Sequence, residues 1–187
     1  MKLRRIGTGI AVTSVFAAGL WAGIAAAGWG ADAQAVGLTA SLGAAREVPK
    51  PTGVGSNARG TFSAGLTRKG TGGTLSWRLT FRGLTGAAAA AHIHRAKPGA
   101  AGPVVVALCG PCRSGVRGTA KLKARTVTAL LAGGAYVNVH TAKNPAGEIR
   151  GQVRKGGKPV APPGGTTTTG TTTTTTTTTY TEPPPYP

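Results

Sequence analysis

Acidic side chains are scarce in this sequence. The 187 residues include 22 lysines and arginines but four aspartates and glutamates, so the formal net charge at pH 7 is +18. Downstream of Ala33 there is no aspartate, and the glutamates there are Glu47, Glu148 and Glu182. A Ser-His-Asp triad and a carboxylate-rich calcium loop are therefore excluded in their usual forms. Glu47 with Glu148 is the one remaining acid pair within the body of the chain, and nothing else in the sequence indicates a glycosidase.

Aromatic residues are also few, at 5% of the chain. The cations are scattered rather than gathered beside aromatics, so nucleic acid is not an expected partner. A surplus of positive charge attracts polyanions such as wall polymers, anionic lipid or acidic polysaccharide. Arg78, Arg82, Lys121, Lys123 and Arg150 are candidates for such adhesion. The alternative is that the charge serves only solubility.

Charge is absent from residues 6–31, which follow the basic start MKLRR. The small-residue pattern ADAQA comes next, so we predict a signal peptide over 1–33, cleaved after Ala33, with Ala35 or Ala27 as alternatives. The alternative is an uncleaved N-terminal anchor, since a run of ~20 apolar residues can span a bilayer. Both alternatives predict an extracellular or cell-surface protein, and it contacts the membrane, through this segment, only if the segment is not cleaved.

The C-terminal residues 156–187 contain little that could be buried. Residues 166–179 are threonine except Gly170, and the chain ends in TEPPPYP. We predict a disordered Pro/Thr-rich tail, either a stalk for O-linked sugars or a plain spacer. Residues 36–155 remain as one folded domain, which is large enough for a hydrophobic core.

Cysteine occurs twice, as Cys109 and Cys112 in LCGPC. A Cys-x-x-Cys pair can be a redox motif, half of a zinc site or a local disulfide. A redox motif needs a helix N-terminus, whereas this pair follows the β-type run PVVVAL. In an oxidising compartment we therefore expect a local disulfide.

Period-two alternation dominates the middle of the chain. In TLSWRLTFRGL, apolar Leu75, Trp77, Leu79 and Phe81 alternate with polar residues, as in a half-buried strand. Further short runs lie near residues 38 and 62, and at 90–94, 103–108, 115–122, 135–140 and 147–153. We predict an all-β antiparallel sandwich or barrel of seven to eight short strands. At most one short helix is expected, over 124–134, with Thr126 as N-cap and Gly133 as its stop.

The three histidines fall in two of these runs, as AHIH and AYVNVH. Alternation places His92 and His94 on the face opposite Ile93, and Asn138 and His140 on the face opposite the valines. Glu148 or Arg150, in GEIRGQV, would join them. If the strands are neighbours, His92, His94 and His140 form a candidate copper or zinc site on the outer face of the sheet. The alternative is a hydrogen-bonded cluster, with Asn138 and Glu148, that pins the strands and the loop 95–102.

Five segments together resemble the CHRD domain, a module named after chordin and common in bacterial secreted proteins. The segments are AAREVP (44–49), ARGTF (58–62), LSWRLTFRGL (75–84), AHIHRAKPGAAGPVVVAL (91–108) and AYVNVHTAKNPAGEIRGQV (135–153). The resemblance runs from about residue 38 to 153 and implies a β-rich extracellular module. It implies no mechanism, because the family as a whole lacks an established biochemical activity.

These observations favour a secreted or surface-displayed, non-catalytic binding or structural module for an unknown extracellular ligand, with no cofactor expected. The alternatives are a copper or zinc protein that uses the three histidines, and electrostatic adhesion to anionic cell-wall or surface polymers. Measuring the metal content distinguishes the binding module from the copper or zinc protein. The dependence of binding on salt concentration tests electrostatic adhesion.

Overall fold

The computed structural model describes residues 35–164, and this range forms nine β-strands, one α-helix and one 3-10 turn. The predicted signal or anchor segment (1–33) and residues 165–187 of the predicted tail lie outside the described residues. Within the described range, no helix has the length and apolar character needed to cross a membrane.

The regular elements follow the predicted runs closely, and the longest strands, β2 and β3, have 11 residues each. The strands are β1 (Val36–Gly43), β2 (Arg59–Lys69), β3 (Gly72–Arg82), β4 (Ala88–His94), β5 (Val104–Cys109), β6 (Val116–Leu122), β7 (Tyr136–Thr141), β8 (Ile149–Gln152) and β9 (Arg154–Lys155). The helical elements are η1 (Ala44–Arg46) and α1 (Ala124–Leu131).

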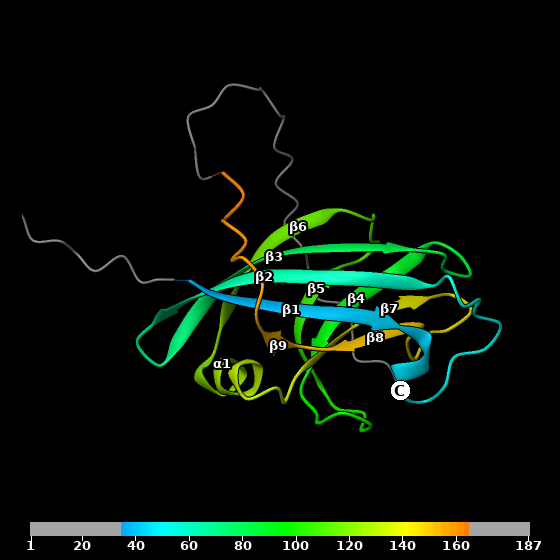
Figure 1. Ribbon diagram of the computed structural model, residues 1–187, viewed down its shortest axis with the longest axis horizontal. Helices are drawn as coiled ribbons and strands as arrows, with labels where there is room; N and C mark the ends of the chain where they lie inside the picture. The colour runs from blue at the N-terminus through cyan, green and yellow to red at the C-terminus, as the bar shows by residue number, and fades with distance from the viewer. Residues whose placement is uncertain (1–34, 165–187) are drawn as a thin grey trace, which may run out of the picture. The chain divides into compact units, whose positions relative to one another are not determined.

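All strand pairs are antiparallel, and eight strands form one path in the order β5-β4-β7-β8-β1-β2-β3-β6, while β9 pairs with β1. The two end strands, β5 and β6, are consecutive in the chain, so the sheet curls until its ends are joined by a short connection. In Figure 1, β6, β3, β2 and β1 form the front of this nearly closed barrel, and β5, β4 and β7 lie behind them. The predicted all-β class with a single short helix is confirmed.

The core follows from the alternation of apolar side chains. β2 and β3 pair Phe62 with Leu79, Ala64 with Trp77 and Leu66 with Leu75, and all six are buried. Ile93 of β4 and Val137 of β7 are paired neighbours from the opposite wall, both fully buried. Burying a large apolar side chain stabilises the fold by roughly 1.5–3 kcal/mol. The alternation of apolar and polar residues in the sequence therefore identifies the side chains that face the core.

The helix begins differently from the sequence prediction. Lys123, not Thr126, is the N-cap of α1, and it makes no side-chain cap hydrogen bond. The prediction of Thr126 as cap was wrong because its side chain is buried against the sheet, in the first turn of the helix. Gly133 ends the helix as expected, since its φ of 70° suits glycine.

Candidate metal centre

The histidine strands are neighbours in the sheet. β4 pairs with β7, which sets His92 opposite Asn138 and Ala90 opposite His140. β7 in turn pairs with β8, which sets Asn138 opposite Arg150. The strands that carry the histidines are therefore adjacent, as the candidate site requires. The polar positions of β4, β7 and β8 share one face of the sheet.

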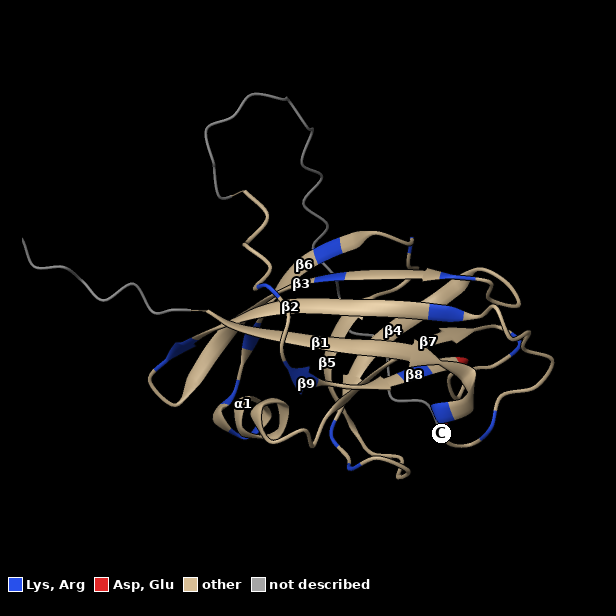
Figure 2. Ribbon diagram, viewed as in Figure 1, with Lys and Arg blue, Asp and Glu red and all other residues tan. Residues whose placement is uncertain are grey.

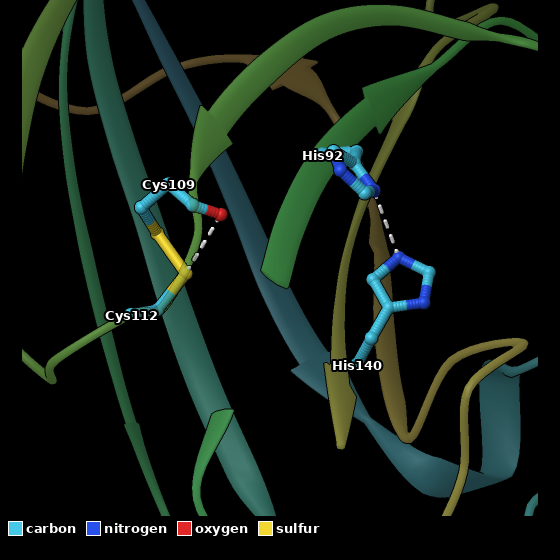
Figure 3. The surroundings of a disulfide bond; sticks show 4 residues. All are labelled: His92, Cys109, Cys112 and His140. Carbon is cyan, nitrogen blue, oxygen red and sulfur yellow. Dashed lines mark hydrogen bonds between the residues drawn. A yellow bond between two sulfur atoms is a disulfide. The ribbon is translucent and has the colours of Figure 1, made fainter. Parts of the chain in front are cut away.

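All three histidines of the chain converge on that face. Each offers one ring nitrogen, and these three atoms lie within 4.8 Å of one another. His92 Nδ1 is 3.1 Å from His140 Nε2, and Figure 3 shows the two rings turned toward each other across β4 and β7. Two nitrogens bound to one tetrahedral zinc at about 2.0–2.1 Å lie about 3.3 Å apart. The His92–His140 separation is therefore close to that of two ligands of one ion.

Backbone carbonyls orient two of the imidazoles. His94 Nδ1 is 2.8 Å from the Gly102 carbonyl oxygen, and His140 Nδ1 is 2.8 Å from that of Pro145. Since a carbonyl only accepts, each Nδ1 carries the proton and each Nε2 carries a lone pair. His94 Nε2 is buried without a hydrogen-bond partner among the described residues. Metal-binding histidines are held in this way, with one nitrogen donating to a carbonyl and the other free for the ion.

The surroundings keep the three imidazoles neutral. Burial, with the nearby His140 and His94, lowers the pKa of His92 to about 4. Burial likewise lowers the pKa of His94 and of His140, against the opposing effects of the Gly102 and Pro145 carbonyls. Only neutral imidazole binds a metal ion. The cluster is therefore uncharged at neutral pH, which is the protonation level that metal binding requires.

The histidine face points away from the hydrophobic core, but it is mostly closed to solvent, with His140 only partly buried. His92 and His94 are 7% and 9% exposed, and Asn138 and Arg150 are 1% exposed. The covering segment is the loop after β4, because Arg150 Nη2 donates to the carbonyls of Lys97 and Ala100. The expectation of an outward polar face is corrected to this extent: the loop encloses it, and Arg150 is not an exposed adhesion residue.

Aromatic stacking ties Arg150 to the histidines. The His94 and Tyr136 rings are stacked, with centroids 4.9 Å apart and an interplanar angle of 7°. The Arg150 guanidinium carbon lies 3.4 Å from the centroid of the same tyrosine ring. A cation over an aromatic face is favourable. The Tyr136 ring therefore fixes both residues.

Glu47 is the residue of this region that the sequence reading did not assign to it. It follows η1, is fully buried, and has Oε2 without a hydrogen-bond partner among the described residues. A Cβ built at Gly147 would lie 2.5 Å from that atom and 2.8 Å from Asn138 Nδ2. Burial raises the pKa of Glu47 to about 7, against the lowering effects of the Val48 amide, Arg150 and Asn138. In the sequence, the only indication that Glu47 belongs to this region is that it is a single acidic residue among basic ones.

Glu148 belongs to a different cluster. Its carboxylate accepts hydrogen bonds from the Thr85 amide (2.6 Å) and hydroxyl (2.5 Å), the Thr141 hydroxyl (2.6 Å) and the Asn144 amide group (3.1 Å). Burial alone would raise the pKa of Glu148, but these hydrogen bonds together hold it below its usual value. Glu148 joins β7 to the turn before β4 and is not a member of the ligand group.

The two cysteines are joined. Cys109 and Cys112 form a disulfide with a Cα–Cα distance of 5.3 Å, at the end of β5 and away from the histidines in Figure 3. The Cys112 amide donates to the Ala88 carbonyl oxygen at 2.9 Å, which attaches the turn to β4. Both cysteines are therefore part of the fold rather than of the histidine cluster.

Comparison with protein-family models places residues 38–153 in the CHRD domain family, and the chain belongs to that family. Searches of curated proteins and of solved structures return no significant match. CHRD domains are extracellular-type modules, and the disulfide fits an exported domain. The family match names neither a ligand nor a reaction.

Proposed function

We propose that this chain is an exported, non-catalytic CHRD binding module whose three-histidine centre binds one Cu²⁺ or Zn²⁺ ion. The observation that carries the proposal is the convergence of the only three histidines, two of them oriented by carbonyl hydrogen bonds that leave a lone pair on Nε2. His92 Nδ1, His94 Nε2 and His140 Nε2 would be the ligands.

The three imidazole donors limit which metal ions the site can bind. Three neutral imidazoles suit zinc and copper, whereas magnesium and calcium require oxygen ligands. Among divalent ions the Irving–Williams order favours Cu²⁺ over Zn²⁺ at the same nitrogen site. Three protein ligands leave one position of a tetrahedral ion for water or for a group of a partner.

The test is calorimetric titration of tag-free protein with Zn²⁺ and with Cu²⁺ at neutral pH. We expect one ion per chain, and a loss of affinity of about 100-fold or more in His92→Ala and in His140→Ala, because two imidazoles hold an ion far less well than three. The control is the Cys109→Ser/Cys112→Ser double variant, which should bind as the parent does. Equal affinity in the parent and in a variant lacking both His92 and His140 would contradict the proposal.

A further inference from the structure

A second concave site lies beside the histidine centre without sharing its ligands. A cleft of about 560 Å³ is bounded by β1, η1, β8, β9 and the turn at Pro98. Its lining contains none of the three histidines. Small-molecule sites commonly have volumes of 300–1,000 Å³, so this cleft can hold a group the size of one or two sugar rings.

Positive charge surrounds the cleft. Arg46, Lys50, Arg150 and Arg154 line it, and no carboxylate does. The two glutamates of the described residues, Glu47 and Glu148, are both fully buried, so neither screens the rim from solvent. In Figure 2 the basic positions include η1, β8 and β9, the elements that bound the cleft. A concave site with cations of one sign focuses the field and concentrates anions.

Arg150 supplies a fixed charge in the cleft wall. Its guanidinium is held by two carbonyl hydrogen bonds from Nη2 and by the Tyr136 ring, while Nη1 has no hydrogen-bond partner among the described residues. A buried cation with an unused donor destabilises the fold unless an anion or acceptor offsets it. Glu47 offsets it only partly, because burial raises the pKa of that carboxyl to about 7.

The remaining lining suits a polyol. Ala45, Val48 and Pro98 contribute aliphatic surface of the kind that packs against the carbon face of a sugar ring. Gln152 donates through Nε2 to the Ala96 and Gly133 carbonyls, which leaves its Oε1 as an acceptor for a hydroxyl group. Ser41 adds a hydroxyl from β1. A surface that attracted anions by charge alone would not need this aliphatic surface or these neutral polar groups.

We propose that this cleft binds a carboxylate-bearing sugar of an extracellular glycan. The carboxylate lies between the exposed Arg46 and Arg154, with the buried charge of Arg150 behind them, and the ring packs on the aliphatic wall. This site is separate from the metal centre, so binding persists in protein stripped of metal with a chelator.

The experiment is calorimetric or NMR titration of metal-free protein with trigalacturonate at near-physiological salt, beside neutral galactotriose and inorganic tripolyphosphate. Two double variants remove the same charge: Arg46→Gln/Arg154→Gln inside the cleft, and Arg78→Gln/Arg117→Gln on exposed positions of β3 and β6 outside it. We expect trigalacturonate to bind best and the cleft variant to lose about tenfold or more in affinity, with the outer variant close to the parent.

A third variant, Arg150→Lys, keeps the charge but lacks the planar guanidinium whose Nη2 donates to both loop carbonyls and which lies over the Tyr136 ring, and it is expected to weaken binding of trigalacturonate. If it does not fold, the two double variants still decide the question. Equal weakening in both double variants would overturn the proposal in favour of diffuse attraction. Tripolyphosphate or galactotriose binding as well as trigalacturonate would overturn the assignment of a sugar acid.

Discussion

Two buried polar clusters flank the same strand, β7, and they differ in how completely their atoms are hydrogen-bonded. Around Glu148, four donors meet one carboxylate, and neither carboxylate oxygen is left without a partner. Around the histidines, His94 Nε2, Asn138 Oδ1, Glu47 Oε2 and Arg150 Nη1 are all buried with no partner among residues 35–164. Buried polar groups in folded proteins are normally hydrogen-bonded, so the first cluster is explained by the fold alone. The second is not explained by the fold alone, and the proposed ion would take up the lone pair of His94 Nε2.

The largest effect is expected where the bonded cluster is broken. Glu148→Ala leaves the donors of Thr85, Thr141 and Asn144 buried and unpaired, so the free energy of unfolding should fall by about 3 kcal/mol or more. His140→Ala, which removes a less buried ring, should cost about 1 kcal/mol or less. Urea denaturation of both variants in metal-free buffer checks the contrast. A larger loss in His140→Ala than in Glu148→Ala would reverse the assignment of the two clusters.

An intermediate effect is expected from the loop that orients His94. A Cβ at Gly102 would lie 2.1 Å from the Arg95 carbonyl oxygen, so Gly102→Ala must displace the loop and its carbonyl. Loss of an outer hydrogen bond to a metal-binding histidine commonly weakens metal affinity by about 10–100-fold. Gly86→Ala, which meets nothing within 4 Å, is the matched control. Metal titration that gives the same affinity for Gly102→Ala and Gly86→Ala would remove the role of the carbonyl.

The smallest effect concerns Glu47 and pH. The pKa of Glu47 is about 7 in the folded protein, whereas its ordinary value is 4.5, so the folded state holds the proton more tightly than the unfolded state does. This stabilisation is fully present below pH 4.5 and is lost as pH rises through about 7. Between pH 6.5 and 8 the histidines titrate in the unfolded state of both metal-free proteins and cancel in the comparison, so the stability of Glu47→Gln relative to the parent should rise with pH. Parallel stability curves for the two proteins over that range would show that Glu47 does not titrate there.

The sequence predicted those features of the histidine cluster that depend on the local direction of side chains along a strand. Period two placed Ile93 and Val137 inward and His92, His94 and His140 together, because side-chain direction along a strand is fixed by the backbone. The pattern could not choose between Glu148 and Arg150, since alternation puts residues two apart on the same side and the choice depends on which loops cover each of them. Long-range contacts decided the rest. The loop after β4 buries the histidine face, and the turn after β1 brings in Glu47, which lies far away in the sequence.

The most direct measurement is the X-ray absorption spectrum of the protein loaded with one equivalent of Zn²⁺ or Cu²⁺. The account predicts three imidazole nitrogens at about 2.0–2.1 Å and one exchangeable non-imidazole ligand such as water, with the imidazole signal reduced in His94→Ala. A first shell with one imidazole or none, or a spectrum unchanged by that substitution, would contradict it.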